Sequence, residues 1–511
     1  MSTFAAYPAF SMLSRAVPRM WFTSYLFLSL SSLLLAQAAN PDLASRLNSE
    51  GMALLDQGRL KEAVDRFRQA IQSDPNNISA HNNLGVTLRR QGDFSGALSV
   101  LENALRLRPD DARIHSNLGL TLHGLGRLNE SLATMRKAAS IEPQNATIRR
   151  HLGIMLFEAG DEQQAEKELQ TALRLAPNDA DVHKALARLL IRSKQIAEAI
   201  EHYRISLRLD PGQPDLHYEL GKLFQEKGEL EQAVRELEAA LNLKADYFEA
   251  HQALGAVYLQ IGNLAEAEKR LREALHLKPN SGESRRDLGI VLGKLGKLSE
   301  AIAELRLATE LLPGDSSSHW NLGTLLRRVG RPEEAGTELR AAHQLNQKEK
   351  DSILAKTYHN TGTKLLKSGQ IEEAIAQLQQ ALKLNPEDGL AHYNYGVALL
   401  VQNKLDEAII QFQTALRLKV KDPNTHYYLG RALLARNQPA EAVGFLQEAV
   451  RLMTGDARAH NALAVALAQV RNFQQAVAAL EAARRLEPNN TLFNSNLTCV
   501  ERHLQGCVLT P

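Results

Sequence analysis

The chain has 511 residues, of which 44% are hydrophobic, 23% are charged and only 5% are aromatic. This composition excludes an acidic disordered chain and a multi-pass membrane protein. The aromatic content is also lower than we expect for a chain that folds into several independent globular domains, each with its own core. Lys and Arg number 60 against 58 Asp and Glu, and this near balance argues against a general nucleic-acid-binding protein.

Residues 1–38 have the pattern of a secretory signal peptide. Arg15 and Arg19 precede an apolar run over 21–35, and the run closes on Ala-Gln-Ala. A positive flank, a short apolar core and a small-x-small motif predict cleavage after this motif and export to the periplasm or the medium. The alternative is an uncleaved membrane anchor over 21–39, which is near the lower limit of ~17 residues for a span.

A constant period organises most of the remaining chain. Gly51, Gly85 and Gly119 are evenly spaced, and thirteen units of equal length fill 44–490 once an insertion at 350–354 is allowed for. In each unit, apolar and small residues recur at three- and four-residue steps in two segments, the spacing of one helix face. This pattern predicts that each unit folds as a hairpin of two helices.

Two positions of the unit, counted from Ala44 as position 1, predict where its helices end. Position 15 is Gly in nine units and Asn403 or Asn437 in two others, and these residue types tolerate the left-handed conformation that ends a helix. Lys194 and Arg471 depart from this rule. Proline at position 32 ends the second helix in most units, because it cannot donate a backbone hydrogen bond.

Small residues recur at positions 8, 20 and 27, where helix backbones approach closely. Position 8 is Gly in eleven units, and positions 20 and 27 are each Ala in twelve. Together with leucine-type residues at positions 7 and 11 and proline at 32, this pattern resembles the tetratricopeptide repeat, whose period is about 34 residues. The resemblance implies an all-α, right-handed solenoid of stacked hairpins, whose first helices line a concave groove that binds proteins or peptides.

The repeats also predict the domain organisation. Repeats 1–9 occupy 44–349, repeats 10–13 occupy 355–490, and a capping helix with a tail follows over 491–511. Because no Gly or Pro interrupts 340–356, we expect 350–354 to extend a helix. The alternative is a short linker that divides the array there.

The sequence offers no catalytic or cofactor motif. It has no phosphate-binding Gly-Lys-Ser/Thr loop, no His-Glu-x-x-His and no Gly-x-Ser-x-Gly. Some glycosyltransferases that modify Ser and Thr carry a similar array, but their catalytic domain follows the repeats, and here only 491–511 follow them. We predict no catalytic residue, no cofactor and no small-molecule substrate.

Nine of the sixteen histidines share position 4 of the unit. They are His81, His115, His183, His217, His251, His319, His392, His426 and His460. A packed-helix step of ~8–10 Å separates neighbours along a solenoid, whereas zinc ligands converge at ~2 Å on one ion. We therefore expect a packing role for these histidines and no metal site.

The candidate peptide-binding residues lie at positions 5 and 6 of the first helices. Position 6 carries Asn83, Asn117, Asn321, Asn360 and Asn394, and position 5 carries Trp320, His359, Tyr393 and Tyr427. In the transferases mentioned above, asparagines at position 6 contact the backbone of bound peptides, and an amide can both donate and accept. Other residues interrupt the row, so packing alone remains the alternative.

A second candidate surface is a basic strip on repeats four to six. It consists of Arg150, Lys184, Arg188, Arg192 and Lys222. Lys184, Arg188 and Arg192 are four residues apart on one helix and therefore share a face. We expect Arg150 and Lys222 to lie beside them on neighbouring units, so these cations suit a partner with acidic segments. The alternative is a solvated face that Glu158, Glu219 and Glu226 neutralise.

The only two cysteines are Cys499 and Cys507. On a continuous helix, eight residues rise about 12 Å, which exceeds the ~7 Å limit between the Cα atoms of a disulfide. Gly506 allows the chain to fold back, so a bridge in an oxidising compartment stays open.

These observations predict an exported, non-catalytic scaffold that binds extended protein or peptide segments, with no nucleic-acid partner. Two alternatives remain: a repeat subunit associated with an enzyme such as a peptide-modifying glycosyltransferase, and a membrane-anchored structural protein of the cell envelope.

Overall fold

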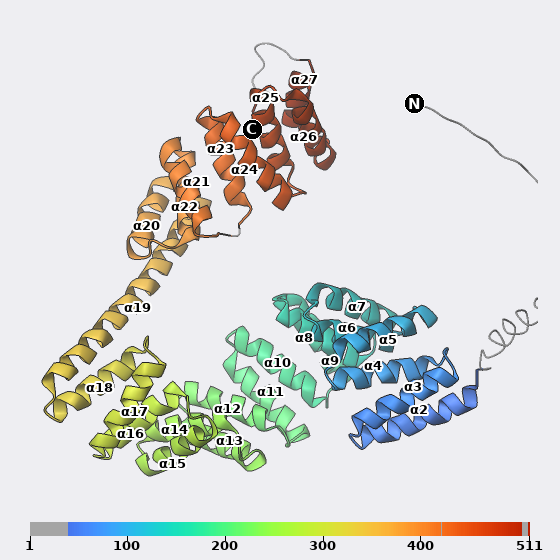
Figure 1. The fold of residues 1–511 in the computed structure, drawn as a ribbon, viewed down its shortest axis with the longest axis vertical. Helices are drawn as coiled ribbons and strands as arrows, with labels where there is room; N and C mark the ends of the chain where they lie inside the picture. The colour runs from blue at the N-terminus through green and yellow to red at the C-terminus, as the bar shows by residue number, and fades with distance from the viewer. Residues whose placement is uncertain (1–38, 421, 503–508, 511) are drawn as a thin grey trace, which may run out of the picture. The chain divides into compact units, whose positions relative to one another are not determined.

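The computed structural model describes residues 39–420, 422–502 and 509–510. Within this part the chain forms 26 α-helices and no strand (Figure 1). It divides into two compact units, the first ending at Lys278 and the second beginning at Pro279. The predicted signal peptide, residues 1–38, and Cys507 lie outside the described residues. The all-α fold of tandem hairpins is confirmed.

The N-terminal unit contains seven hairpins. Their first helices are α2 (Pro41–Asp56), α4 (Ile78–Arg90), α6 (Ala112–Gly124), α8 (Ala146–Glu158), α10 (Ala180–Arg192), α12 (Pro214–Glu226) and α14 (Phe248–Ile261). Their second helices are α3 (Leu60–Ser73), α5 (Phe94–Leu107), α7 (Leu128–Ile141), α9 (Glu162–Leu175), α11 (Ile196–Leu209), α13 (Leu230–Leu243) and α15 (Leu264–Leu277).

The C-terminal unit continues the same alternation. Its helices are α16 (Gly282–Lys294), α17 (Leu298–Leu311), α18 (Ser316–Arg328), α19 (Pro332–Lys367), α20 (Ile371–Leu384), α21 (Gly389–Val401), α22 (Leu405–Arg417), α23 (Asn424–Ala435), α24 (Pro439–Leu452), α25 (Ala457–Gln469), α26 (Phe473–Leu486) and α27 (Thr491–Glu501). α19 has 36 residues and runs unbroken through 350–354. It packs against α18 near one end and α20 near the other, and so serves two consecutive repeats (Figure 1).

The turns within the hairpins use the left-handed conformation that position 15 predicts. All nine position-15 glycines have φ between 72° and 88°. Asn403 and Asn437 have φ of 60° and 62°, and Lys194 and Arg471 adopt the same conformation at 62° and 63°. A side chain with a Cβ costs about 1 kcal/mol or more in this region, so Lys194 and Arg471 strain their turns.

Position 34 caps the first helix of the following repeat. Its side-chain oxygen accepts a hydrogen bond from a first-turn N–H at Asn77, Asp111, Asn145, Asp179, Ser281, Asp315, Asp388, Asp456 and Asn490. Such a cap stabilises a helix by about 1 kcal/mol.

The glycine at position 8 lets the two helices of a hairpin approach. A Cβ added to Gly85 on α4 would lie 2.6 Å from Cγ of Leu101 on α5. Ala97 and Ala104 on α5, at positions 20 and 27, have no exposed surface. The core is thus a thin layer that repeats between neighbouring helices.

The last described helix, α27, packs on α26 and α25 and ends at Glu501. Cys499 on this helix is buried and disulfide-bonded. Among the described helices, none has the length and apolar character needed to cross a membrane.

Candidate functional site

The first helices of neighbouring repeats contact one another in both units. Such contacts join α2 to α4, α4 to α6, α8 to α10, α12 to α14, α16 to α18, α21 to α23, α23 to α25 and α25 to α27. Positions 5 and 6 form hydrogen bonds and ion pairs along these contacts, and we call the surface that they form the first-helix surface.

Three pairs of asparagines link neighbouring first helices on this surface. In each pair, Nδ2 of the position-6 residue donates to Oδ1 of a position-5 asparagine on the preceding first helix. The pairs are Asn83 with Asn48 at 3.0 Å, Asn117 with Asn82 at 2.8 Å, and Asn496 with Asn461 at 2.8 Å. We call these three contacts the amide pairs. Each leaves one N–H and the Oδ1 of its position-6 amide for another partner.

The third amide pair holds a segment of the chain's own C-terminus. Nδ2 of Asn496 and Nδ2 of Asn461 donate to the main-chain oxygen of Thr510, at 2.8 and 2.9 Å. Oδ1 of Asn496 accepts from the main-chain N–H of the same residue at 3.3 Å. In this structure, an amide pair therefore binds both polar groups of one main-chain residue.

The other predicted position-6 asparagines have different partners. Asn321 donates to the main-chain oxygen of Ser317, one turn earlier on its own helix, at 2.8 Å. Asn360 is exposed on α19, and no hydrogen bond joins its side chain to other described residues. Asn394 on α21 donates to Thr363 Oγ1 at 3.0 Å and contacts His359 at 3.2 Å.

The contact with Asn394 determines the tautomer of His359. An amide nitrogen can only donate, so Nε2 of His359 accepts, and its Nδ1–H donates to Asp388 at 2.8 Å. Burial by itself would raise the pKa of Asp388, but the bonds from His359 and the N–H of Ala391 hold that pKa below its usual value. His359 thus supports the N-cap of α21.

The predicted aromatic residues of position 5 are not equally accessible. Trp320 on α18 is 58% exposed, whereas Tyr427 on α23 is 5% exposed. Tyr393 and Tyr427 both pack against Tyr428, with ring centroids 6.0 and 5.1 Å apart. Of the residues at these four positions, Trp320 is therefore the most exposed.

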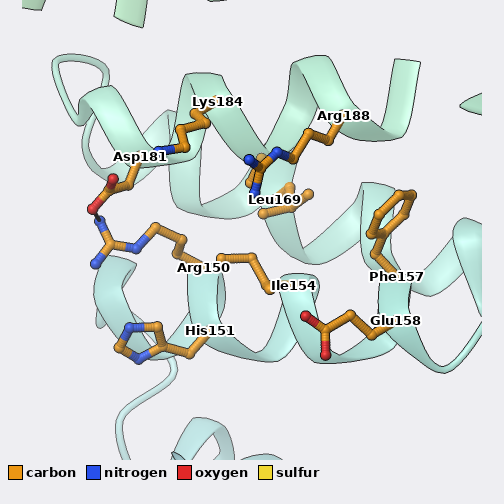
Figure 2. Close-up of a pocket in the computed structure, with 10 residues that line it drawn as sticks. Arg150, His151, Ile154, Phe157, Glu158, Leu169, Asp181, Lys184 and Arg188 are labelled. Atoms are coloured by element: carbon orange, nitrogen blue, oxygen red, sulfur yellow. Dashed lines mark ion pairs between the residues drawn. The ribbon is translucent and has the colours of Figure 1, made fainter. Parts of the chain in front are cut away.

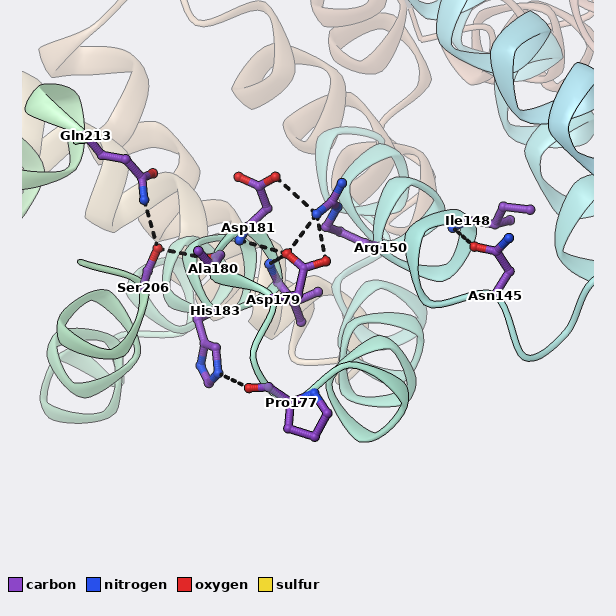
Figure 3. Close-up of polar contacts among 11 residues, drawn as sticks. Asn145, Ile148, Arg150, Pro177, Asp179, Ala180, Asp181, His183, Ser206 and Gln213 are labelled. Carbon is purple, nitrogen blue, oxygen red and sulfur yellow. Dashed lines mark hydrogen bonds and ion pairs between the residues drawn. The ribbon is translucent and has the colours of Figure 1, made fainter. Parts of the chain in front are cut away.

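The cations of the basic strip have counter-ions in neighbouring repeats. Arg150 pairs with Asp179 at 2.8 Å and with Asp181 at 3.0 Å (Figure 3). Lys184 pairs with Asp215 at 3.3 Å, Arg188 with Glu219 at 2.6 Å and Arg192 with Glu162 at 2.6 Å. Among the described residues, Lys222 has only a 3.4 Å bond to Gln225 and no ion pair.

These counter-ions differ in part from the expected ones. Glu219 acts as expected, but Glu158 binds His123 instead. Asp179, the partner of Arg150, is the N-cap of α10, and the same relation joins Arg286 to Asp315 and His359 to Asp388. Position 5 thus pairs with the cap of the next repeat, and the strip carries little uncompensated positive charge.

A cavity of about 280 Å³ lies between α8 and α10 beside this strip (Figure 2). Its lining includes the apolar side chains of Ile154, Phe157 and Leu169 together with His151. Three residues of the basic strip also line it: Arg150, Lys184 and Arg188. Burial, followed by the charges of Arg150 and Arg89, lowers the pKa of His151 to about 4. This histidine is therefore neutral at physiological pH.

The histidines of position 4 stabilise the junctions between repeats. Seven of the nine bring Nε2 to the main-chain oxygen six residues earlier, at 2.7 to 3.4 Å; they are His81, His115, His183, His251, His319, His392 and His460. Figure 3 shows this contact between His183 and Pro177. A carbonyl oxygen only accepts, so Nε2 is protonated in these residues and is not a metal ligand. The described part of the chain contains no group of three or more metal-ligating side chains.

The position-5 asparagines Asn48, Asn82 and Asn461, and Asn496 on the capping helix, were not among the predicted residues. Their signal in the sequence is an asparagine at position 5 of one repeat followed by another at position 6 of the next. This spacing, one repeat plus one residue, places the two side chains next to each other on adjacent helices.

The solved structures that resemble this chain have low sequence identity to it. The Cut9–Hcn1 hetero-tetramer of APC/C has 16% identity, a TM-score of 0.37, and coverage of 93% of this chain and 98% of the other. Pseudomonas aeruginosa pilF has 22% identity, a TM-score of 0.38, and coverage of 41% and 95%. YrrB, described as a TPR protein with an unusual peptide-binding site, has 25% identity, a TM-score of 0.32, and coverage of 35% and 91%. No curated protein sequence matches the chain.

Family models match the chain over most of its length. Models of the tetratricopeptide repeat, or TPR, match residues 54–120, 88–139, 122–189, 258–326, 315–387, 360–424, 411–457 and 427–491, and a further TPR model matches 187–228 and 222–262. Together these matches extend from residue 54 to residue 491. The chain belongs to the tetratricopeptide repeat family.

Proposed function

We propose that this protein is a non-catalytic scaffold that binds extended segments of partner proteins on its first-helix surface. Membership in the TPR family supports a general role in protein–protein interaction. The amide pairs support the more specific proposal, because they present donors and acceptors of the kind that an extended main chain can satisfy.

The observation that carries this proposal is the repetition of one arrangement. The pairs Asn48–Asn83 and Asn82–Asn117 lie on consecutive repeats of the N-terminal unit and have the same bond and spacing as the pair that binds Thr510. Apart from these bonds, the side chains of Asn83 and Asn117 have no hydrogen-bond partner in the described part of the chain. Their remaining polar atoms can therefore bind the main chain of another protein.

Side-chain contacts would add selectivity to this main-chain binding. Trp320, which is 58% exposed, is suited to bury an apolar side chain of a partner. Lys222 is the strip residue suited to a carboxylate, whereas an acidic segment at Arg150 would have to displace Asp179 and Asp181.

The proposal can be tested with peptides selected from a displayed random library against the full chain. We expect the double substitution Asn83→Ala and Asn117→Ala to weaken the binding of selected peptides about tenfold, since each lost hydrogen bond contributes ~1 kcal/mol or less. Asn129→Ala is the matched control, because Asn129 is an exposed asparagine on the second helix α7. Unchanged affinity in the double variant, measured by fluorescence anisotropy, would overturn the assignment of this surface.

We also propose that the protein is exported after cleavage of residues 1–38. The leader pattern supports this, and so does the disulfide at Cys499, since stable disulfides are typical of oxidising compartments. N-terminal sequencing of the protein from its native host should begin at residue 39. An intact leader in the membrane fraction would favour the anchored alternative.

A further inference from the structure

The C-terminal residues Leu509 and Thr510 return to the first-helix surface of the last repeat. Asn461 lies on α25 and Asn496 on α27, and they are 1% and 2% exposed with these residues in place. Leu509 packs against the hydrophobic cluster of the C-terminal repeats, which includes Leu497. The contact therefore combines an apolar side chain with three hydrogen bonds to the amide pair.

The hydrogen bonds to Thr510 depend on its main chain and not on its side chain. Asn496 accepts from its N–H and donates to its oxygen, as a residue of a neighbouring strand does in a hydrogen-bonded β pair. Any residue except proline can make both bonds. Selectivity comes instead from the preceding residue, whose side chain must be apolar to replace Leu509.

We propose that Leu509 and Thr510 are an intramolecular ligand of the Asn461–Asn496 pair, and that this site binds extended peptides with an aliphatic residue followed by a non-proline residue. The tail competes with such peptides because it is attached to the same chain, which gives it an effective concentration in the millimolar range. This inference rests on the proposed function only in treating the amide pairs as binding sites.

The test uses the full chain with Leu509→Glu and Thr510→Pro. These substitutions remove the apolar contact and the donating N–H and therefore release residues 509–510 from the amide pair. The probe is a fluorescent peptide with the sequence of residues 503–511, in which Cys507 is replaced by serine. We expect the released variant to bind the probe at least tenfold more tightly than the unaltered chain does.

One further variant and one modified probe identify the atoms involved. Adding Asn496→Ala to the released variant should remove probe binding. A probe that is N-methylated at the nitrogen corresponding to Thr510 should bind the released variant about five- to tenfold more weakly, because it lacks one hydrogen bond. Equal binding of the methylated and unmethylated probes, or no binding to the released variant, would overturn the proposal.

A measurement on the unaltered chain avoids any effect of substitution on folding. Because Thr510 is exposed, its amide would exchange at the rate of an unstructured peptide if its N–H had no hydrogen-bond acceptor. We expect its exchange to be at least tenfold slower because its N–H donates to Asn496. Unprotected exchange would contradict the proposal, whatever the result at Asn83 and Asn117.

Discussion

The side chain of Asn117 on α6 donates to the side chain of Asn82 on α4 at 2.8 Å, so one hydrogen bond joins two consecutive repeats. Asn82 is 7% exposed, whereas Asn117 is half-buried. The side chain of Asn82 is therefore part of the packed interior, and that of Asn117 remains partly accessible to a partner. The same residues thus stabilise the stack and provide a binding surface. In the three amide pairs, this double role depends on an asparagine at position 5 of the preceding first helix.

Substitution of Gly85 by alanine should destabilise the second hairpin. The new Cβ would lie 2.6 Å from Cγ of Leu101, and the backbones of α4 and α5 would have to separate. We expect a loss of about 1–3 kcal/mol in local stability, measured by hydrogen exchange of α4 and α5. Gly444→Ala on α24 is the control, since nothing lies within 4 Å of the corresponding Cβ. Equal protection in the two variants would contradict this account of position 8.

Removal of the cap at Asp388 should loosen the start of α21. Its carboxylate accepts from the N–H of Ala391 at 3.0 Å and from Nδ1 of His359 at 2.8 Å. Asp388→Ala should cost about 1–2 kcal/mol and speed up hydrogen exchange in the first turn of α21. Asp388→Asn, which keeps an acceptor oxygen, should cost less, and an equal cost in both variants would show that capping is not the cause.

Protonation of His151 should make the stability of α8 depend on pH. Its pKa is about 4 in the folded chain, against an ordinary value of 6.5, because of burial and then the charges of Arg150 and Arg89. Between these two values the unfolded segment binds more protons than the folded one, so stability falls as the pH is lowered from 6.5 to 4. The stabilising effect is fully present above pH 6.5, and the loss levels off below pH 4 at up to about 3 kcal/mol.

The variant His151→Gln isolates this effect from the titration of acidic residues. Hydrogen exchange of α8 should lose protection more steeply in the unaltered chain than in the variant between pH 6.5 and 4. Parallel pH dependence in the two proteins would mean that His151 does not contribute.

Trp320 should matter for binding and not for folding. Because its side chain is 58% exposed, Trp320→Ala should leave the helical content measured by circular dichroism unchanged. Some peptides selected against the full chain should bury an apolar side chain against Trp320. These peptides should lose about 1–2 kcal/mol of binding free energy when they bind the Trp320→Ala variant. Tyr427→Ala is the contrasting variant, since that buried ring should be needed for the stability of α23. Unchanged affinity for every selected peptide would remove Trp320 from the binding surface.

The sequence predicted the hairpins and turns well because both depend on local chemistry. A glycine at position 15 allows the left-handed turn, and a glycine at position 8, such as Gly85, allows close helix packing. The constant period then repeats these local choices along the chain. The stacking of the hairpins was predicted from the resemblance to the tetratricopeptide repeat, which rests on these positions together with the period.

The candidate site was harder to predict because its partners lie in different repeats. Arg150 pairs with Asp181 on the first helix of the next repeat, and the partner of Asn117 lies in the repeat before it. Such pairings depend on how neighbouring first helices are offset, which the period alone does not give. The return of Thr510 to Asn496 depends on the path of the tail and has no periodic signal.

The most direct test of main-chain binding is an N-methyl scan of one selected peptide against the full chain and the variant with Asn83→Ala and Asn117→Ala. Methylation of a nitrogen that donates to an amide pair should weaken binding to the unaltered chain about five- to tenfold and have little effect on binding to the variant. Equal effects of methylation on both proteins, at every nitrogen of the peptide, would contradict the claim that these amides bind an extended main chain.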